Sequence, residues 1–299
     1  MKEAIAERYA SVYGVEVDPA RQVAIVPGTK TALCEVALVA AERGTTILLP
    51  DPGYPDYFSA VALADARLES LPLDDVGQPV WQAVDAGDAS LVYLNYPSNP
   101  TAAVADADVF DEAVEFARRH DALVLHDFAY GDLVYDGRSP RSFLAAEGAK
   151  DVGVELFSMS KSYGMAGWRL GFVVGNDEIV RRIELYQDHV RAGIFAPLQH
   201  AAIAALRGPQ DSVEARRRAY EARRDRVLEV VDGRCDGTFF VWLRLPDGVT
   251  VERLLDEHRI ALAPGQGFGA RGTGYARLSL AVRDETLARG LERLRLALG

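Results

Sequence analysis

One lysine of this sequence follows an apolar stretch at a position where it could act as a nucleophile. Residues 154–157 have the composition of a buried strand, and Ser158, Ser160 and Lys161 come directly after it. Burial disfavours the charged ammonium of a lysine, and the neutral amine that results can attack carbonyl groups and form Schiff bases. Arg169 follows in a glycine-rich run, and this combination of residue types at this spacing makes the signal specific.

Polar side chains follow two other apolar stretches. Asp127 comes after residues 123–125, and Tyr130 follows it closely. A carboxylate at such a position needs a cationic partner, because an unpaired buried charge is costly. Asn99 lies between two prolines in residues 95–101, a rigid way to present one amide at a strand end, although the same run is also typical of a simple turn.

A third polar segment opens a predicted helix. Gly28, Thr29 and Lys30 follow the apolar residues 23–26, and a helix beginning there would offer free N–H groups to an anion such as a phosphate. A tight turn with a threonine cap explains the same residues more simply when they are considered alone.

The elements that must position these residues alternate along the chain. Short apolar strands are predicted at residues 23–26, 46–49, 91–94, 123–125 and 154–157, with helices between most of them. This pattern predicts a mainly parallel sheet covered on both faces, whose ligands lie beyond the carboxyl ends of the strands.

The remainder of the chain has a different pattern. Long helical segments are predicted at residues 177–206 and 210–231, followed by strands and helices at 238–245, 250–258, 260–263, 275–281 and 284–298. We therefore predict three parts: an N-terminal helix at 1–14, a large domain at 15–207 and a small C-terminal domain at 208–299.

The composition excludes several function classes. The 299 residues carry a formal net charge of −11 without a dense run of Lys and Arg, so nucleic acid is not expected as a partner. No apolar stretch approaches the ~18 residues that span a bilayer, so no membrane partner is expected. Cys34 and Cys235 have no paired spacing, and the five histidines have no metal-ligand spacing. We expect a cytoplasmic protein without a bound metal.

Asp127, the run Ser158-Met159-Ser160-Lys161 and Arg169, in this order and spacing, resemble the pyridoxal-phosphate-dependent aminotransferases of fold type I, class I and II. Three further runs narrow the resemblance: residues 49–57, 126–131 and 186–189. They look like the branch that contains methionine-salvage aminotransferases and LL-diaminopimelate-type enzymes. The resemblance implies an α/β fold with a mainly parallel sheet, helices on both faces and a smaller C-terminal α+β domain.

The resemblance also implies a role for each residue around the cofactor ring. Lys161 would hold the aldehyde of pyridoxal 5'-phosphate and later carry a proton between the substrate and the cofactor. Asp127 would pair with the pyridinium nitrogen, and Tyr130 and Asn99 would bond to the ring hydroxyl. Tyr57 would stack on the ring face.

Phosphate and substrate contacts follow from the same resemblance. The implied phosphate ligands are Gly28, Thr29, Lys30, Ser158, Ser160 and Arg169. Arg277 and Asn99 would bind the substrate carboxylate, although Arg277 could also be a salt-bridged strand arginine. The family resemblance further implies a homodimer.

The function implied is transfer of an amino group between an L-amino acid and a 2-oxo acid by a ping-pong route. Methionine and 4-methylthio-2-oxobutanoate are the first substrates to test. The alternatives are a lyase of the same fold type that catalyses β-elimination, or a shortened cofactor-binding protein with little activity. The last arises because relatives carry an arm, a strand and a glycine segment ahead of the first helix found here.

Two short motifs point elsewhere and are discounted. Ser158-x-x-Lys161 matches serine acylases, but no Lys-Thr-Gly triplet accompanies it. Gly265-x-Gly267-x-x-Ala270 imitates a dinucleotide-binding turn, but a strand rather than a helix is predicted after it.

Overall fold

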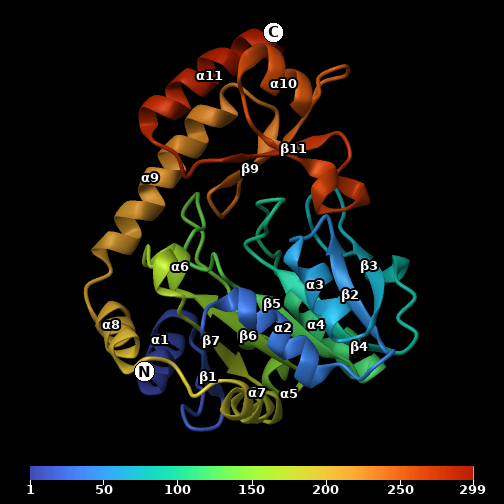
Figure 1. The fold of residues 1–299 in the computed structure, drawn as a ribbon, viewed down its shortest axis with the longest axis vertical. Helices are drawn as coiled ribbons and strands as arrows, with labels where there is room; N and C mark the ends of the chain where they lie inside the picture. Colours follow the sequence, from blue (N-terminus) through green and yellow to red (C-terminus); the bar gives the residue numbers. More distant parts are fainter. Residues whose placement is uncertain (299) are drawn as a thin grey trace.

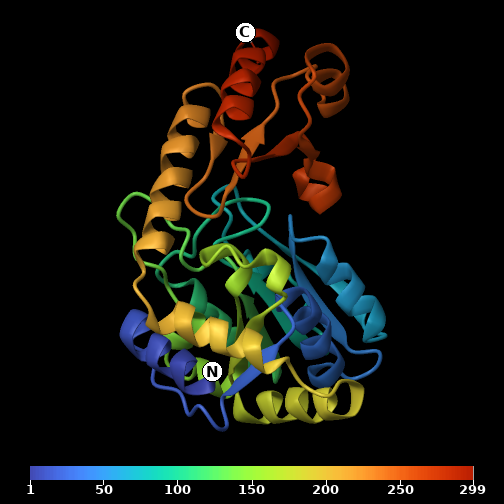
Figure 2. The same cartoon turned by 60° about the vertical axis from the view of Figure 1, so that its left-hand side comes forward.

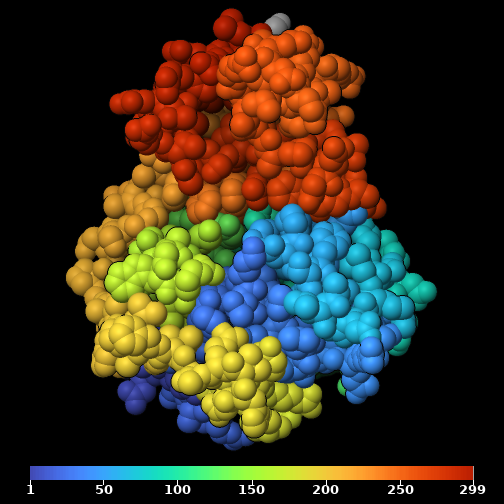
Figure 3. Space-filling view, viewed as in Figure 1, coloured from blue at the N-terminus to red at the C-terminus, as the bar shows by residue number. Residues whose placement is uncertain are grey.

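A computed structural model describes residues 1–298 and shows two lobes of unequal size (Figure 1). The larger lobe is built around a seven-stranded sheet and the smaller one around a four-stranded sheet. The chain passes from the large to the small lobe after α8 (Ala196–Arg207), along the long helix α9 (Asp211–Leu228). In the space-filling view the small lobe, drawn in orange and red, sits directly on the large one (Figure 3).

The large sheet is mainly parallel. Its strands, in spatial order, are β1 (Val23–Val26), β7 (Gly171–Gly175), β6 (Gly153–Ser158), β5 (Leu123–Asp127), β4 (Ala89–Asn95), β2 (Thr46–Asp51) and β3 (Arg67–Pro72). Only the pairs that involve β7 are antiparallel. The carboxyl ends of β1, β4, β5 and β6 therefore lie at one edge of the sheet, as the alternating sequence pattern predicts.

Helices cover both faces of this sheet, because consecutive residues of its central strands are buried and point to opposite faces. One face packs against α1 (Lys2–Arg8), α4 (Val109–His120), α5 (Ala149–Val152) and α8. The other packs against α2 (Thr29–Ala40), α3 (Asp56–Leu63) and α7 (Asp177–Val190). Val124 and Leu125 of β5 illustrate the alternation, since the first belongs to one core and the second to the other.

The N-terminal segment packs with the large lobe. Ala4, Ile5 and Tyr9 are buried in its core, and Figure 2 shows α1 lying against α8. The chain continues through a π-helical turn at Tyr9–Tyr13 and turns at Gly14, whose φ of 67° suits glycine.

The small lobe is an antiparallel sheet covered by helices on one face. Its strands, in spatial order, are β10 (Ala263–Pro264), β11 (Tyr275–Ser279), β9 (Phe240–Arg244) and β8 (Gly233–Arg234). α9, α10 (Val251–His258) and α11 (Asp284–Leu298) pack on this sheet. Its other face carries Phe240 and Arg277 and is turned toward the large lobe, where Arg277 donates a hydrogen bond to Asn99.

Several elements differ from the sequence prediction. The strand predicted at 260–263 is found instead at β10 and shares only Ala263 with it, and β8 was not predicted. The helix expected at 177–206 is interrupted between α7 and α8, because Gly193 has a φ of 95° and Pro197 begins a new helix. β3 was not predicted, since its first residues are exposed at the sheet edge and lack an apolar signal. Short 3-10 segments occur at Trp81–Ala83, Phe143–Ala145, Ala166–Trp168, Gly265–Phe268 and Ala270–Gly272. Among residues 1–298, no helix combines the length and apolar character needed to cross a bilayer.

Candidate active site

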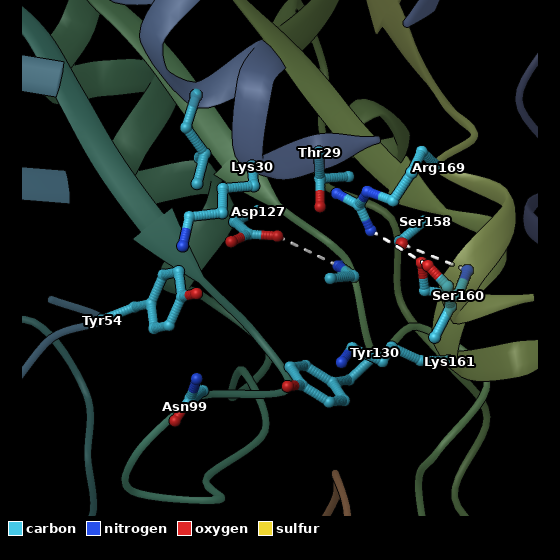
Figure 4. A pocket seen from close by; sticks show the side chains of 13 residues that line it. Thr29, Lys30, Tyr54, Asn99, Asp127, Tyr130, Ser158, Ser160, Lys161 and Arg169 are labelled. Carbon is cyan, nitrogen blue, oxygen red and sulfur yellow. Dashed lines mark hydrogen bonds between the residues drawn. The ribbon is translucent and has the colours of Figure 1, made fainter. Parts of the chain in front are cut away.

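A cavity of about 160 Å³ opens at the carboxyl edge of the large sheet (Figure 4). Its walls come from segments that are far apart in the sequence and that the parallel strands bring to one edge. The residues that line it are Thr29, Lys30, Leu33, Tyr54, Asn99, Asp127, Ala129, Tyr130, Ser158, Ser160, Lys161, Ala166 and Arg169. Nine of the residues predicted from the sequence therefore lie around one space.

Asp127 is a buried carboxylate with few partners. It ends β5, where the Tyr57 hydroxyl donates to Oδ2 at 2.9 Å and the Ala129 N–H donates to Oδ1 at 3.2 Å. Burial raises the pKa of Asp127, and the bond from Tyr57 opposes this effect. Within residues 1–298 no cation forms a salt bridge with it, so the carboxylate can still receive an N–H from a bound molecule.

Lys161 lies across the cavity on the short helix α6 (Met159–Ser162). Its Nζ is 5.6 Å from the ring centroid of Tyr130 and 5.2 Å from that of Phe239. Burial lowers the pKa of Lys161, and although Asp127 opposes the shift, Arg169 and Arg277 add to it. The neutral amine is therefore more accessible than in an exposed lysine, which suits a nucleophile.

One end of the cavity is suited to an anion. Figure 4 shows the Arg169 guanidinium beside Thr29, with Ser158 and Ser160 nearby. Gly28, at a φ of 87°, leaves space for this side chain, because a Cβ there would lie 2.7 Å from Nη2 of Arg169. α2 begins directly after it, and the first N–H groups of a helix have no partner within the helix.

Arg277 reaches the site from the small lobe. Its Nη1 donates to Oδ1 of Asn99, and its guanidinium carbon lies 4.0 Å from the ring centroid of Phe240 and 4.6 Å from that of Phe268. Burial lowers the pKa of Arg277. Within residues 1–298 no carboxylate forms a salt bridge with this guanidinium, which differs from the alternative of a salt-bridged strand arginine.

Tyr57, the residue predicted to stack on the ring, does not line the cavity. The structure buries it completely between Asp127 and Tyr93, so its hydroxyl supports the carboxylate from behind. Tyr54 lines the cavity instead. Tyr54 precedes α3 and Tyr57 lies in its first turn, and both belong to the same short run of the sequence, so the sequence could not distinguish them.

Three other cavity residues were not predicted. Leu33 and Ala166 contribute apolar wall, and Ala129 contributes the N–H that binds Asp127. Ala129 could have been found, because it directly follows the strand end that carries Asp127. Leu33 and Ala166 have no distinguishing signal in a single sequence.

The family model for aminotransferase class I and II matches residues 1–294 of the chain. The chain belongs to this family. It is 42% identical to the L-glutamine--4-(methylsulfanyl)-2-oxobutanoate aminotransferase of Bacillus subtilis, an alignment that covers 98% of this chain and 78% of that relative. It is 39% identical to the LL-diaminopimelate aminotransferase of Moorella thermoacetica, over 100% of this chain and 80% of the relative. The substrate-bound BacF structure from Bacillus subtilis superposes with a TM-score of 0.95 at 38% identity, covering 99% of this chain and 79% of that one.

The chain is therefore a class I and II transaminase, and its cofactor is pyridoxal phosphate. The cavity fits this cofactor chemically. An aldehyde, a ring nitrogen and a phosphate need an amine, an acid and an anion cradle, and Lys161, Asp127 and Arg169 lie around the same cavity. The comparisons also support the predicted fold, since the solved relatives share it over almost the whole chain.

Proposed function

We propose that Lys161 binds the cofactor covalently and that the chain moves an amino group between an L-amino acid and a 2-oxo acid by a ping-pong route. The observation that carries the proposal is the meeting of Lys161, Asp127 and Arg169 around one cavity. A lysine with a lowered pKa, a buried acid and an anion site are needed together only when one ligand carries an aldehyde, a basic nitrogen and a phosphate.

Each side chain then has a task set by its environment. When bound, pyridoxal phosphate supplies an electron-withdrawing ring that stabilises negative charge on the substrate carbon. Asp127 holds a proton at the ring nitrogen, and Lys161 accepts and returns the proton of the substrate Cα. Burial raises the pKa of Tyr130, so its hydroxyl stays protonated and, with Asn99, can donate to an oxygen on the ring. Tyr54 covers one face of the ring.

The phosphate would be held at the other end of the cavity. Its ligands in this proposal are the side chains of Ser158, Ser160 and Arg169 and the backbone at Gly28, Thr29 and Lys30. The side chain of Lys30 is engaged elsewhere, because its Nζ lies 2.8 Å from Oδ2 of Asp56. Lys30 therefore contributes through its N–H rather than through its ammonium.

Arg277 selects substrates that carry an α-carboxylate. A guanidinium matches a carboxylate with two parallel hydrogen bonds, and Asn99 holds the fork in place. Phe240 and Phe268 lie against it and favour an apolar or thioether side chain beside the carboxylate. The name of the Bacillus subtilis relative supports 4-methylthio-2-oxobutanoate as the first acceptor to test.

A panel of 2-oxo acids offered with glutamine, methionine and aspartate tests this function. We expect amino transfer to 4-methylthio-2-oxobutanoate, with product detected by chromatography, and weaker use of aspartate. Release of pyruvate and ammonia from cysteine-type substrates without amino transfer would assign the chain to the lyases instead. An absence of turnover despite cofactor binding would favour the alternative of a cofactor-binding protein with little activity.

We also propose that the chain acts as a cytoplasmic homodimer. The corner between α7 and α8 exposes two large apolar side chains, Val190 at 58% and Phe195 at 70%, which a partner surface would cover. Arg191, beside them, forms an ion pair with the buried Glu35. Light scattering on the purified chain tests the dimer, and Phe195→Asp should shift it toward monomer.

A further inference from the structure

A buried arginine outside the cavity joins two of the turns that build it. Arg8 ends α1, and only 5% of its side chain is exposed. Its Nη2 donates to Oδ1 of Asp132 at 2.5 Å and to the hydroxyl of Tyr13 at 3.0 Å. Its Nη1 donates to the hydroxyl of Tyr163 at 3.1 Å. One guanidinium thus binds three separate segments of the large lobe.

The partners of Arg8 lie next to the residues that line the cavity. Asp132 is in the turn that follows Tyr130, and Tyr163 is in the turn that follows Lys161. The guanidinium carbon also lies 4.9 Å from the ring centroid of Phe157, which directly precedes Ser158. The position of Arg8 therefore fixes where the Tyr130 turn lies relative to the Lys161 turn.

The Arg8–Asp132 pair is a poor source of stability. Arg8 Nε and Asp132 Oδ2 are both buried without a hydrogen-bond partner. A buried ion pair with unsatisfied atoms contributes little to the free energy of folding, and well-packed apolar residues of similar volume often replace one without loss. Apolar residues, however, could not form the directional hydrogen bonds by which the guanidinium of Arg8 joins the turns of Asp132 and Tyr163.

The same network reaches the connection between the lobes. The Tyr163 hydroxyl donates to Oε1 of Gln210 at 3.1 Å, and Gln210 directly precedes α9. Arg216 of α9 donates to the carbonyl of Ser162 in the same turn. The Lys161 turn is therefore held from α1 on one side and from the helix that carries the small lobe on the other.

We propose that Arg8 is a positioning residue of the transaminase site, which sets the distance between the Lys161 turn and the Tyr130 turn through Tyr163 and Asp132. The inference rests on the proposed roles of Lys161 and Tyr130. Arg8 does not line the cavity, so it acts on the reaction through these turns alone.

Three variants of the full chain loaded with cofactor separate positioning from stability. Arg8→Met alone leaves Asp132 buried without its cation, so both the Tm and kcat should fall. The double variant R8M/D132L removes both charges, and its Tm should return to within a few degrees of the wild type. Its kcat should stay tenfold to a hundredfold low, on the order of what a small misplacement of reacting groups causes. R223M/D284L removes a more exposed arginine–aspartate pair, formed by α9 and α11, and serves as the control for loss of an ion pair far from the cavity.

Two readings distinguish a positioning role from a structural one. In R8M/D132L the KM should change less than kcat, because Arg277 and Asn99 still bind the substrate. The pH midpoint of the visible absorbance of the bound cofactor should also move, because the surroundings of Lys161 change. kcat is expressed per mole of bound cofactor below the melting transition, so a loss of folded protein does not obscure it. The control should change neither quantity.

These measurements decide between a positioning and a structural role for Arg8 even if R8M/D132L remains unstable. If kcat per bound cofactor and the absorbance midpoint of R8M/D132L equal those of the wild type, Arg8 is only a structural residue and the inference is wrong. An inactive wild type without a visible absorbance band would instead reject the proposed function.

Discussion

Two buried carboxylates on neighbouring strands, Asp127 and Glu155, have opposite surroundings. Glu155 is completely buried and receives hydrogen bonds from the hydroxyls of Tyr9 and Ser142 and from the N–H of Phe143. It also lies 2.8 Å from Nδ1 of His126. Asp127 receives two hydrogen bonds, and burial raises its pKa.

The sheet explains how two such sites can be so close. His126 and Asp127 are consecutive on β5, so they point to opposite faces, and His126 pairs in register with Glu155 on β6. The face with Glu155 is closed by Tyr9 of the π-helical turn and by the segment around Ser142. The face with Asp127 opens at the strand end into the cavity. A buried acid with all its acceptors engaged stabilises a fold, whereas one left with free acceptors is available for a ligand.

The largest effect is expected on stability, when the fully hydrogen-bonded carboxylate of Glu155 is replaced. Glu155→Gln turns an amide NH2 toward groups that donate hydrogen bonds and leaves His126 without its carboxylate. Each buried group that loses its hydrogen-bond partner costs about 1–3 kcal/mol of unfolding free energy, and several groups donate to Glu155. Denaturant titration measures this, with the exposed Glu147→Gln as control. Turnover per folded molecule should change little, and a large loss there would contradict the division between the two sites.

The next largest effect is expected on turnover, when the carboxylate of Asp127 is replaced. Asp127→Asn keeps the shape of the side chain but removes the charge that would hold a proton at the ring nitrogen. kcat should fall by on the order of 10²–10³, as for loss of one group aimed at the reacting charge. Steady-state kinetics at saturating cofactor measure it. Near-normal turnover would show that Asp127 is as structural as Glu155.

A smaller effect on kcat is expected when Asp127 loses the hydrogen bond from Tyr57. Tyr57→Phe removes one of the two donors to the carboxylate, and since that bond lowers the pKa of Asp127, the pKa should rise further. A hydrogen bond to a charged group contributes about 1.5 kcal/mol or more, so kcat should fall roughly tenfold. Tyr93→Phe is the matched control, because Tyr93 packs against Tyr57 but donates to the carbonyl of Leu33. Equal losses in both variants would remove the special role of Tyr57.

The smallest effect concerns stability without cofactor. Because burial raises the pKa of Asp127, its contribution to stability is fully present below its unfolded pKa of about 3.9 and is lost as the pH rises through the folded value. Asp127→Asn should therefore melt higher than the wild type at pH 7.5, by roughly 2–4 °C for each kcal/mol relieved, and the difference should shrink toward pH 4. Calorimetry of both cofactor-free chains measures it. A wild type that melts higher at pH 7.5 would mean that Asp127 is already satisfied.

The sequence predicted the strands and the side chains that line the cavity better than the residues that contact them from behind. Apolar strands that alternate with helices correctly predicted the sheet, and polar residues after those strands predicted which side chains meet at its edge. Arg8, Glu155 and the exchange of Tyr57 for Tyr54 were not predicted. Their positions depend on how α1 and α3 pack against the sheet, and a single sequence carries no record of such long-range contacts.

The proposal that Lys161 holds the cofactor can be tested directly, because the lysines of the chain are only Lys2, Lys30, Lys150 and Lys161. The purified chain, loaded with pyridoxal phosphate, is reduced with borohydride, digested and mapped by mass spectrometry. We expect the cofactor mass on Lys161 alone, and its loss in Lys161→Ala but not in Lys30→Ala. A label on Lys30, or a Lys161→Ala chain that keeps the visible band after dialysis, would contradict it.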